Sequence, residues 1–305
     1  MEWLSKISIT CFVASYLVVL ALEISRIFFA AKYRPVIRFG FAVAGLFAHS
    51  VYMVWQRKLE LGSDGIWLNS WFGWCLTTAW IIGAAYLWIS IRKPMSMMGL
   101  FLLPVLLTLI WTGQFLGNED PFLDSRAKSI WGMIHGISLS LGTAVIALGF
   151  VFGIVYLVHA KRLKNKKLAS NYFRLPSLEW LQRSCESSII ISTLFFASGF
   201  LSGIALNVAN QAIQSSELKG TISWADPVVW SSGVLFLWLL AISVFSAFYQ
   251  PARQGRKVAY LVVTSFIFFA IELMIVFLAN HAVHAVPAAM LFEYSSVPAT
   301  LEMMR

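Results

Sequence analysis

The sequence predicts an all-α protein, a polytopic membrane helix bundle with about eight transmembrane helices and both termini outside. Three observations lead to this prediction. Only 12% of the 305 residues are charged, about half of the roughly 25% that soluble domains carry. Apolar runs of about 20 residues, long enough to cross a ~30 Å hydrocarbon core, recur along the whole chain. Basic residues gather in alternate connections between these runs.

The apolar runs are predicted to be helices because a segment in lipid must satisfy its backbone hydrogen bonds internally. In chain order we expect spans over residues 8–30, 36–55, 71–91, 96–116, 131–159, 187–209, 228–249 and 258–280. The fifth is longer than a bilayer requires, so it should tilt or project beyond the membrane.

We treat residues 1–305 as a single membrane domain. Four N-terminal spans fall in 1–130 and four more in 131–285, with an external tryptophan-bearing loop at 210–227 and an external tail at 286–305.

Loop charges set the expected orientation. The connections after the first, third, fifth and seventh spans hold fifteen Lys and Arg residues, against five in the intervening connections. Basic loops stay in the cytoplasm, so the loops around 56–70, 117–130 and 210–227 should face outward with the termini. The longest basic segment, 160–183, is expected to lie along the anionic inner leaflet, with protein docking as the alternative.

Several classes of function are disfavoured. The net charge of +9 is explained by topology, so we expect no nucleic-acid partner. Cys11, Cys75 and Cys185 form neither a CxxC nor a CxxCH motif and are expected to be small core residues. The sequence contains no HExxH-type metal signature and shows no nucleophile–base pair, so we expect a protein that is not an enzyme.

Four of the five histidines are predicted near the outer face. His135 lies in the first turn of the fifth span, His281 and His284 lie three residues apart at the end of the eighth, and His49 lies in the outer half of the second. Neutral imidazole is a good axial ligand for haem iron. The alternative is that these are interfacial histidines bonded to loop carbonyls, and His159 belongs to the opposite end.

Other residues of the predicted spans can be explained by structural roles alone. Tryptophans at the outer level could line a haem pocket, although membrane interfaces collect tryptophan without any ligand; these are Trp67, Trp71, Trp74, Trp131, Trp224 and Trp230. Small residues four apart, including Gly199 and Gly203, predict close helix contacts. Glu23 should pair with Arg26, and Glu272 should find its partner on another helix, either as a neutral hydrogen-bonded group or beside the site.

From Trp131 onward the chain resembles the cytochrome c assembly protein family, the haem-handling group of CcsA, CcmC and HemX type. The resemblance is carried by Trp131-Gly-Met-Ile-His135-Gly, by Gly149-Phe150 and Tyr156-Leu157, and by the stretch Arg174-Leu-Pro176-Ser-Leu178-Glu179. Gly199 and Gly203 stand where the family has a glycine-rich helix. The eight predicted spans agree in number with HemX-like members.

The resemblance implies a site in which an external tryptophan-rich loop presents b-type haem between two external histidines. His135 falls on the first histidine position, and His281 or His284 falls near the second. Trp224, Asp226, Pro227 and Trp230 stand where the loop shapes the porphyrin edge. Two departures, Val228-Val229 in place of Lys-Glu and Tyr249 in place of a further histidine, favour a HemX-like or divergent member.

The resemblance therefore implies a haem-handling protein of a bacterial plasma membrane that assists c-type cytochrome biogenesis. Its partners would be membrane lipid, other cytochrome c assembly proteins or apocytochrome c. Two other readings stay open: a haem-free scaffold or regulator with a degenerate site, and a small-solute permease. A permease would be expected to show internal repeats and interrupted helices, and only Pro104 lies well inside a span.

Overall fold

The structure is a computed structural model that describes residues 8–29, 31–60, 68, 70–94, 96–116, 130–165, 175–213, 224, 227–249 and 255–284. Within these ranges, residues 56–60, 116, 210–213 and 276–284 are described as backbone only. Every regular element in the described ranges is a helix. In chain order they are α1 (Ile9–Ser25), α2 (Arg34–Glu60), α3 (Trp71–Arg92), α4 (Gly99–Leu116), α5 (Ile130–Lys164), α6 (Leu178–Ile213), α7 (Pro227–Phe248) and α8 (Arg256–His284).

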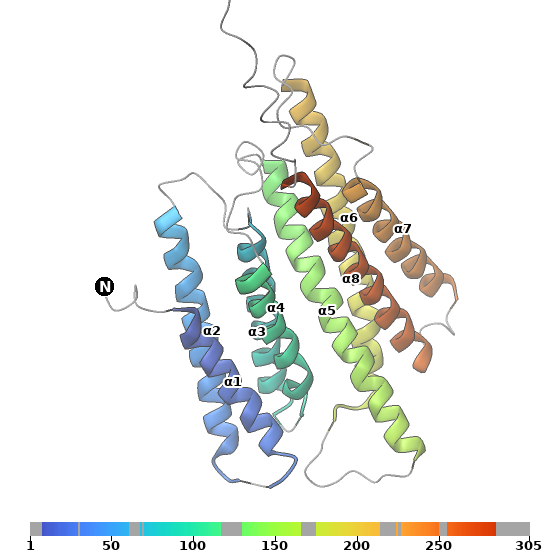
Figure 1. Ribbon diagram of the computed structural model, residues 1–305. Coiled ribbons are helices and arrows are strands. Elements are labelled where there is room, and N and C mark those ends of the chain that lie inside the picture. The colour runs from blue at the N-terminus through green and yellow to red at the C-terminus, as the bar shows by residue number, and fades with distance from the viewer. Residues whose placement is uncertain are drawn as a thin grey trace, which may run out of the picture.

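The helices run alternately up and down, so that the two ends of the bundle differ in chemistry (Figure 1). One end holds the C-termini of α1, α3, α5 and α7 and the N-termini of the helices that follow them. Since the residues flanking these junctions are rich in Lys and Arg, we call it the basic end. The other end holds the start of α5 and the last turns of α8, with His135, His281 and His284, and we call it the histidine end.

The described helices form a multi-pass membrane bundle, as the sequence predicts. Six of them are long and apolar enough to cross a bilayer, and α1 and α4 are shorter apolar helices that complete the set. The outer surface carries large apolar side chains that water would not tolerate, among them Phe47, Leu194, Leu237 and Phe248. Such a surface is stable only when the surrounding solvent is lipid.

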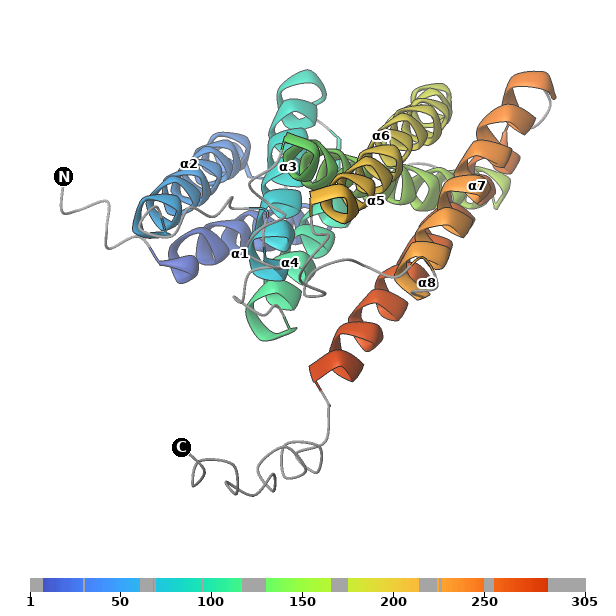
Figure 2. The same cartoon turned by 90° about the horizontal axis from the view of Figure 1, so that it is seen from above.

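The two halves of the bundle meet at α5. Seen from above, α1–α4 lie on one side of α5 and α6–α8 on the other (Figure 2). A continuous buried core joins Phe12, Tyr16 and Leu76 of the first half to Val155 and Val262 of the second. Helix α5 packs most extensively against α6. This packing holds the start of α5, and with it His135, against the upper part of α6.

Close approach of α5 and α8 depends on glycine. A Cβ atom at Gly149 would lie 2.8 Å from Val262 Cγ2, and one at Gly153 would lie 2.8 Å from Val262 Cγ1 and 3.1 Å from the carbonyl oxygen of Ala259. In lipid, helix association depends on such close packing, because there is no hydrophobic effect between helices. These two glycines therefore fix the lower half of α8 on α5.

Several helix ends differ from the predicted spans. Helix α6 begins at Leu178 rather than near 187, since Ser177 accepts a hydrogen bond from the backbone N–H of Trp180 at 3.4 Å and Glu179 lies in the first turn. Helix α5 continues to Lys164, so residues 160–164 and 178–183 of the basic segment 160–183 belong to α5 and α6. At the other end, α6 extends to Ile213, which shortens the predicted loop 210–227.

Candidate functional site

His135 lies in the interface between α5 and α6, where two glycines of α6 make room for it. A Cβ atom at Gly203 would lie 3.0 Å from both Cε1 and Nδ1 of the His135 ring, and one at Gly199 would lie 2.6 Å from Leu139 Cδ2. Ordinary side chains do not approach so closely, so Gly203 provides the flat surface on which the ring rests. The predicted close helix contact at Gly199 and Gly203 is confirmed. At Gly203 the contacting side chain is that of His135, the candidate haem ligand.

The His135 ring is fixed by a hydrogen bond to the α6 backbone. Its Nδ1 atom lies 2.7 Å from the carbonyl oxygen of Gly199. A carbonyl oxygen can only accept, so Nδ1 must carry the proton and donate it. The proton on Nδ1 leaves Nε2 with its lone pair, and Nε2 is then the nitrogen able to bind a metal. Metal-binding histidines in proteins are oriented in the same way, by donating the other ring N–H to a carbonyl or a carboxylate.

Buried serines support this arrangement. Ser202 donates its hydroxyl to the carbonyl oxygens of Ser198 at 2.7 Å and Gly199 at 3.0 Å, and the Ser138 and Ser198 hydroxyl oxygens lie 3.1 Å apart across α5 and α6. The Gly199 oxygen therefore lies within hydrogen-bond distance of both His135 Nδ1 and the Ser202 hydroxyl, which is shared with Ser198. These serines were not among the predicted site residues. The signal in the sequence is the run of small residues around Gly199 and Gly203, which predicts only a close helix contact.

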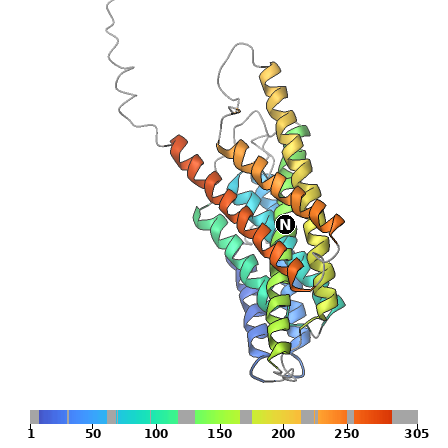
Figure 3. The same cartoon turned by 90° about the vertical axis from the view of Figure 1, so that its right-hand side faces the viewer.

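The last turns of α8 lie at the same end of the bundle as His135. Helix α8 ends at His284, so His281 and His284 occupy its final turns, although their side chains lie outside what the structure describes. Figures 2 and 3 show α8 slanting away from the start of α5 as it approaches this end. The structure therefore brings the two helix ends to one face of the bundle but does not close α8 onto His135.

The predicted loop residues are only partly described. Asp226 lies outside the described residues, and Pro227 is the first residue of α7, a position that suits its fixed φ and missing N–H. Trp230 is 68% exposed in the first turn of α7, and Trp224 and Trp131 are about half exposed. Trp74 instead packs against the core cluster that contains Ile146 and Phe196. Exposed tryptophans are expected both in an interfacial belt and in an open loop that presents haem, so their exposure agrees with either interpretation.

His49 and His159 do not join His135. The His49 ring is fully buried and stacks on Phe12 of α1, with ring centroids 4.4 Å apart and an interplanar angle of 2°. His159 lies near the basic end of α5. Cys75 and Cys185 are buried core residues, as predicted, whereas Cys11 is exposed. Within the described part of the chain, no three His, Cys, Asp or Glu side chains gather into a group that could hold a metal ion.

Comparison with known proteins decides the family. The family model for the cytochrome c assembly protein matches residues 67–284, which include α3 to α8 and every described residue of the His135 environment. The chain belongs to the cytochrome c assembly protein family. No curated protein and no solved structure gave a match to the chain.

Membership of this family gives the protein a role in c-type cytochrome biogenesis, within a family associated with haem handling. The matched region begins more than sixty residues before Trp131, where the motifs in the sequence begin, so α3 and α4 belong to the family part of the bundle. Helices α1 and α2 precede it.

Proposed function

We propose that this member of the cytochrome c assembly protein family holds a non-covalent b-type haem at the histidine end, with His135 as one axial ligand and His281 or His284 as the other. The proposal places the histidine end outside the plasma membrane of a bacterium. The protein's task is to ligate and present haem, not to make or break covalent bonds. Other assembly proteins and apocytochrome c would be its partners.

The observation that carries the proposal is the 2.7 Å hydrogen bond from His135 Nδ1 to the Gly199 carbonyl. This bond orients the ring and selects the tautomer with a free lone pair on Nε2 before any iron arrives. A histidine serving only as an interfacial residue needs no such buried support from Ser202 and Gly203. The donor set suits haem iron, for which neutral imidazole is a common axial ligand.

The second ligand comes from α8 in this proposal. His281 and His284 are three residues apart and so lie on roughly one helix face. We favour His284 because it is the terminal residue of α8, where the chain can most easily turn toward α5. Trp224, Asp226, Pro227 and Trp230, at and before the start of α7, would cover the porphyrin edge. Haem held by both helices should draw the end of α8 toward α5.

The test is the absorption spectrum of the purified full-length protein after haem supplementation. Wild type should show a Soret band, and His135→Ala should lose most of it. His159→Ala is the matched control, because it removes a histidine from the other end of the same helix. A wild-type protein without a Soret band, or a His135→Ala protein with an unchanged one, would contradict the proposal.

Orientation is tested separately with a membrane-impermeant maleimide on intact cells, in a background lacking Cys11. A cysteine introduced at Trp224 should react, and one introduced at Tyr33 should not. The reverse pattern would place the histidine end in the cytoplasm.

A second candidate function is a haem-free scaffold or regulator of cytochrome c assembly. The replacement of Lys-Glu by Val228-Val229 favours it, since the substitution removes two charged side chains from the loop that would present haem. This candidate predicts normal assembly of c-type cytochromes in cells carrying His135→Ala. The haem-holding proposal predicts their loss.

A further inference from the structure

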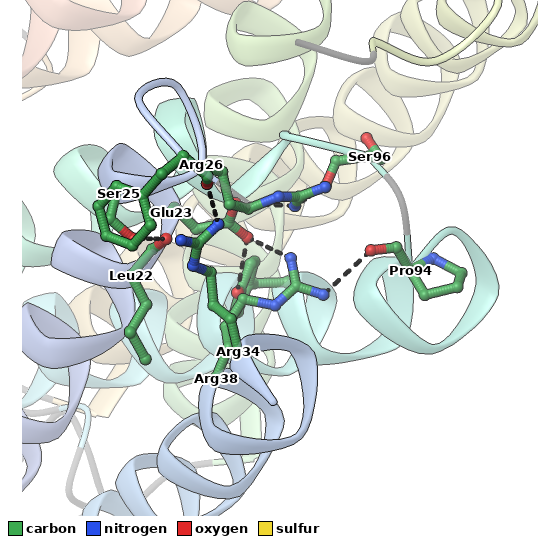
Figure 4. A network of polar contacts seen from close by, with 10 residues as sticks. Leu22, Glu23, Ser25, Arg26, Arg34, Arg38, Pro94 and Ser96 are labelled. Atoms are coloured by element: carbon green, nitrogen blue, oxygen red, sulfur yellow. Dashed lines mark hydrogen bonds and ion pairs between the residues drawn. The ribbon is translucent and has the colours of Figure 1, made fainter. Parts of the chain in front are cut away.

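A buried ion cluster lies at the basic end of the bundle, between α1, α2 and the junction of α3 with α4 (Figure 4). The fully buried Glu23 carboxylate accepts from Arg38 Nη1 at 2.6 Å, from Arg26 Nη1 at 3.1 Å and from the Tyr86 hydroxyl at 3.2 Å. Arg38 also donates to the Pro94 carbonyl at 3.1 Å, and Arg26 to the Ser96 carbonyl at 3.0 Å. These bonds tie α1 and α2 to the family part of the bundle.

Arg34 adds a third guanidinium to this cluster, and it is incompletely bonded. Its side chain is buried, with only 7% of the residue exposed. Nη1 donates to the Phe29 carbonyl at 2.7 Å, and the guanidinium carbon lies 4.6 Å from the centroid of the Phe29 ring. Nη2 is buried without a hydrogen-bond partner in the part of the chain that the structure describes. A buried charged donor left unsatisfied is destabilising, so a partner is expected there.

The charges around Arg34 point to an anion as that partner. The Glu23 carboxylate pairs with two guanidinium groups, of Arg26 and Arg38, and Figure 4 shows a third, that of Arg34, beside them. The sequence from residue 20 to residue 55 contains no other acidic residue. The cluster thus carries an excess of two positive charges in a low-dielectric setting, where uncompensated charge is most costly.

The surroundings of Arg34 indicate that the anion belongs to a lipid. Phe28, Phe29, Tyr33 and Val36 all expose most of their surface next to Arg34. Exposed apolar side chains at the end of a membrane bundle lie among lipids, with the phosphate groups at the level of the helix ends. A guanidinium group matches a phosphate through paired N–H···O bonds, and basic pockets between membrane helices are known to bind anionic headgroups.

We propose that Arg34, with Arg26 and Arg38 beside it, binds the phosphate of an anionic phospholipid at the basic end of the bundle. The lipid neutralises the excess charge, and its acyl chains pack against Phe28, Phe29 and Tyr33. The Arg34 side chain, whose Nη2 is buried in this structure, shifts outward to donate to the phosphate. The site is built on α1 and α2, outside the matched family region, and it is independent of haem binding at the opposite end.

The test compares three additions to the purified full-length protein in neutral detergent: phosphatidylglycerol, phosphatidylcholine and inorganic phosphate. Phosphatidylglycerol should raise Tm by about 3 °C or more and give a one-to-one adduct in native mass spectrometry. Phosphatidylcholine and inorganic phosphate should give little or no shift. An equal shift with phosphatidylcholine, or a full shift with inorganic phosphate alone, would overturn the proposal.

Variants locate the site. Arg34→Gln should abolish both the Tm shift and the adduct with phosphatidylglycerol, whereas Arg183→Gln, an exposed basic residue at the start of α6, should keep both. If Arg34→Gln does not fold, Arg34→Lys takes its place in the test, because it keeps the positive charge but loses the paired N–H groups of a guanidinium. The Tm shift that phosphatidylglycerol causes in Arg34→Lys should be about half that of wild type or less. An unchanged shift in the folded variant would show that phosphatidylglycerol binds elsewhere.

Discussion

His135 Nδ1 and the carbonyl oxygen of Gly199 lie 2.7 Å apart across the interface of the two longest helices, α5 and α6. Because the carbonyl can only accept, this contact determines which ring nitrogen is protonated. It also links the orientation of a candidate iron ligand to the packing of a helix pair. Changes that alter the packing at Gly203 should therefore alter haem binding without touching the ring chemically.

Gly203→Ala should weaken haem binding by tenfold or more. The new Cβ atom would lie 3.0 Å from the His135 ring, so the ring must move and its bond to Gly199 must lengthen. The measurement is a haem titration followed at the Soret band. Gly233→Ala on α7 is the control, because its Cβ atom would meet Phe200 at an ordinary 3.6 Å. Equal haem affinities for the two variants would show that the position of the His135 ring does not affect haem binding.

His284→Ala and His281→Ala should differ. One of them, which we expect to be His284→Ala, should convert a bis-histidine haem spectrum into that of a haem with one strong axial ligand, while the other keeps the wild-type spectrum. The reason is geometric: two residues three apart on a helix cannot both reach the same coordination position. Electron paramagnetic resonance of the oxidised protein measures the change. Wild-type spectra from both variants would remove α8 from the coordination of the haem.

Gly153→Ala should destabilise the bundle by about 1–3 kcal/mol through overpacking against α8. Its Cβ atom would lie 2.8 Å from Val262 Cγ1 and 3.1 Å from the Ala259 carbonyl oxygen, and a backbone atom cannot move aside by rotating. Gly40→Ala is the control, since a Cβ atom there meets nothing within 4 Å and alanine is the better helix former. Thermal unfolding in detergent should give a lower Tm for Gly153→Ala and an unchanged or higher one for Gly40→Ala.

Glu23→Gln should destabilise the protein by about 3–5 kcal/mol, because it leaves the guanidinium groups of Arg26 and Arg38 without their counter-charge. Glu179→Gln removes the carboxylate of another ion pair, with Arg183 at 2.6 Å, but both of its side chains are 74% exposed. Solvent screens that pair, so its loss should cost about 0.5 kcal/mol or less. Similar Tm values for the two variants would show that burial does not make the Glu23 ion pairs contribute more to stability than the exposed Glu179–Arg183 pair.

The helical architecture could be predicted because lipid leaves few alternatives. A run of about 20 apolar residues has to satisfy its own backbone in the bilayer, and a helix is the structure that does so. Spans such as Trp71–Arg92 and Pro227–Phe248 were accordingly predicted to within one residue at either end. The polar ends of α5 and α6 fall outside the predicted spans because hydropathy marks only the apolar part of a helix; projection beyond the membrane was expected for the fifth span alone.

The site was only partly predictable from the sequence. His135 could be singled out because a histidine at a span end is chemically conspicuous, and Glu23 could be paired with Arg26 because they are one turn apart. Arg38 and Tyr86 could not be assigned to Glu23, since they reach it from other helices. The convergence of His135 with His281 or His284 stays a prediction.

The sequence by itself determined the class of protein, the number of apolar segments and the alternation of basic ends, because each follows from local composition and the properties of the bilayer. Only the tertiary structure decided that His135 contacts the Gly199 carbonyl, that the buried His49 ring stacks on Phe12, and that Arg34 lies beside the Glu23 cluster. Those facts depend on how far each helix is rotated about its axis and which neighbour it meets. Rotation is set by packing between helices distant in the chain, which no local pattern records.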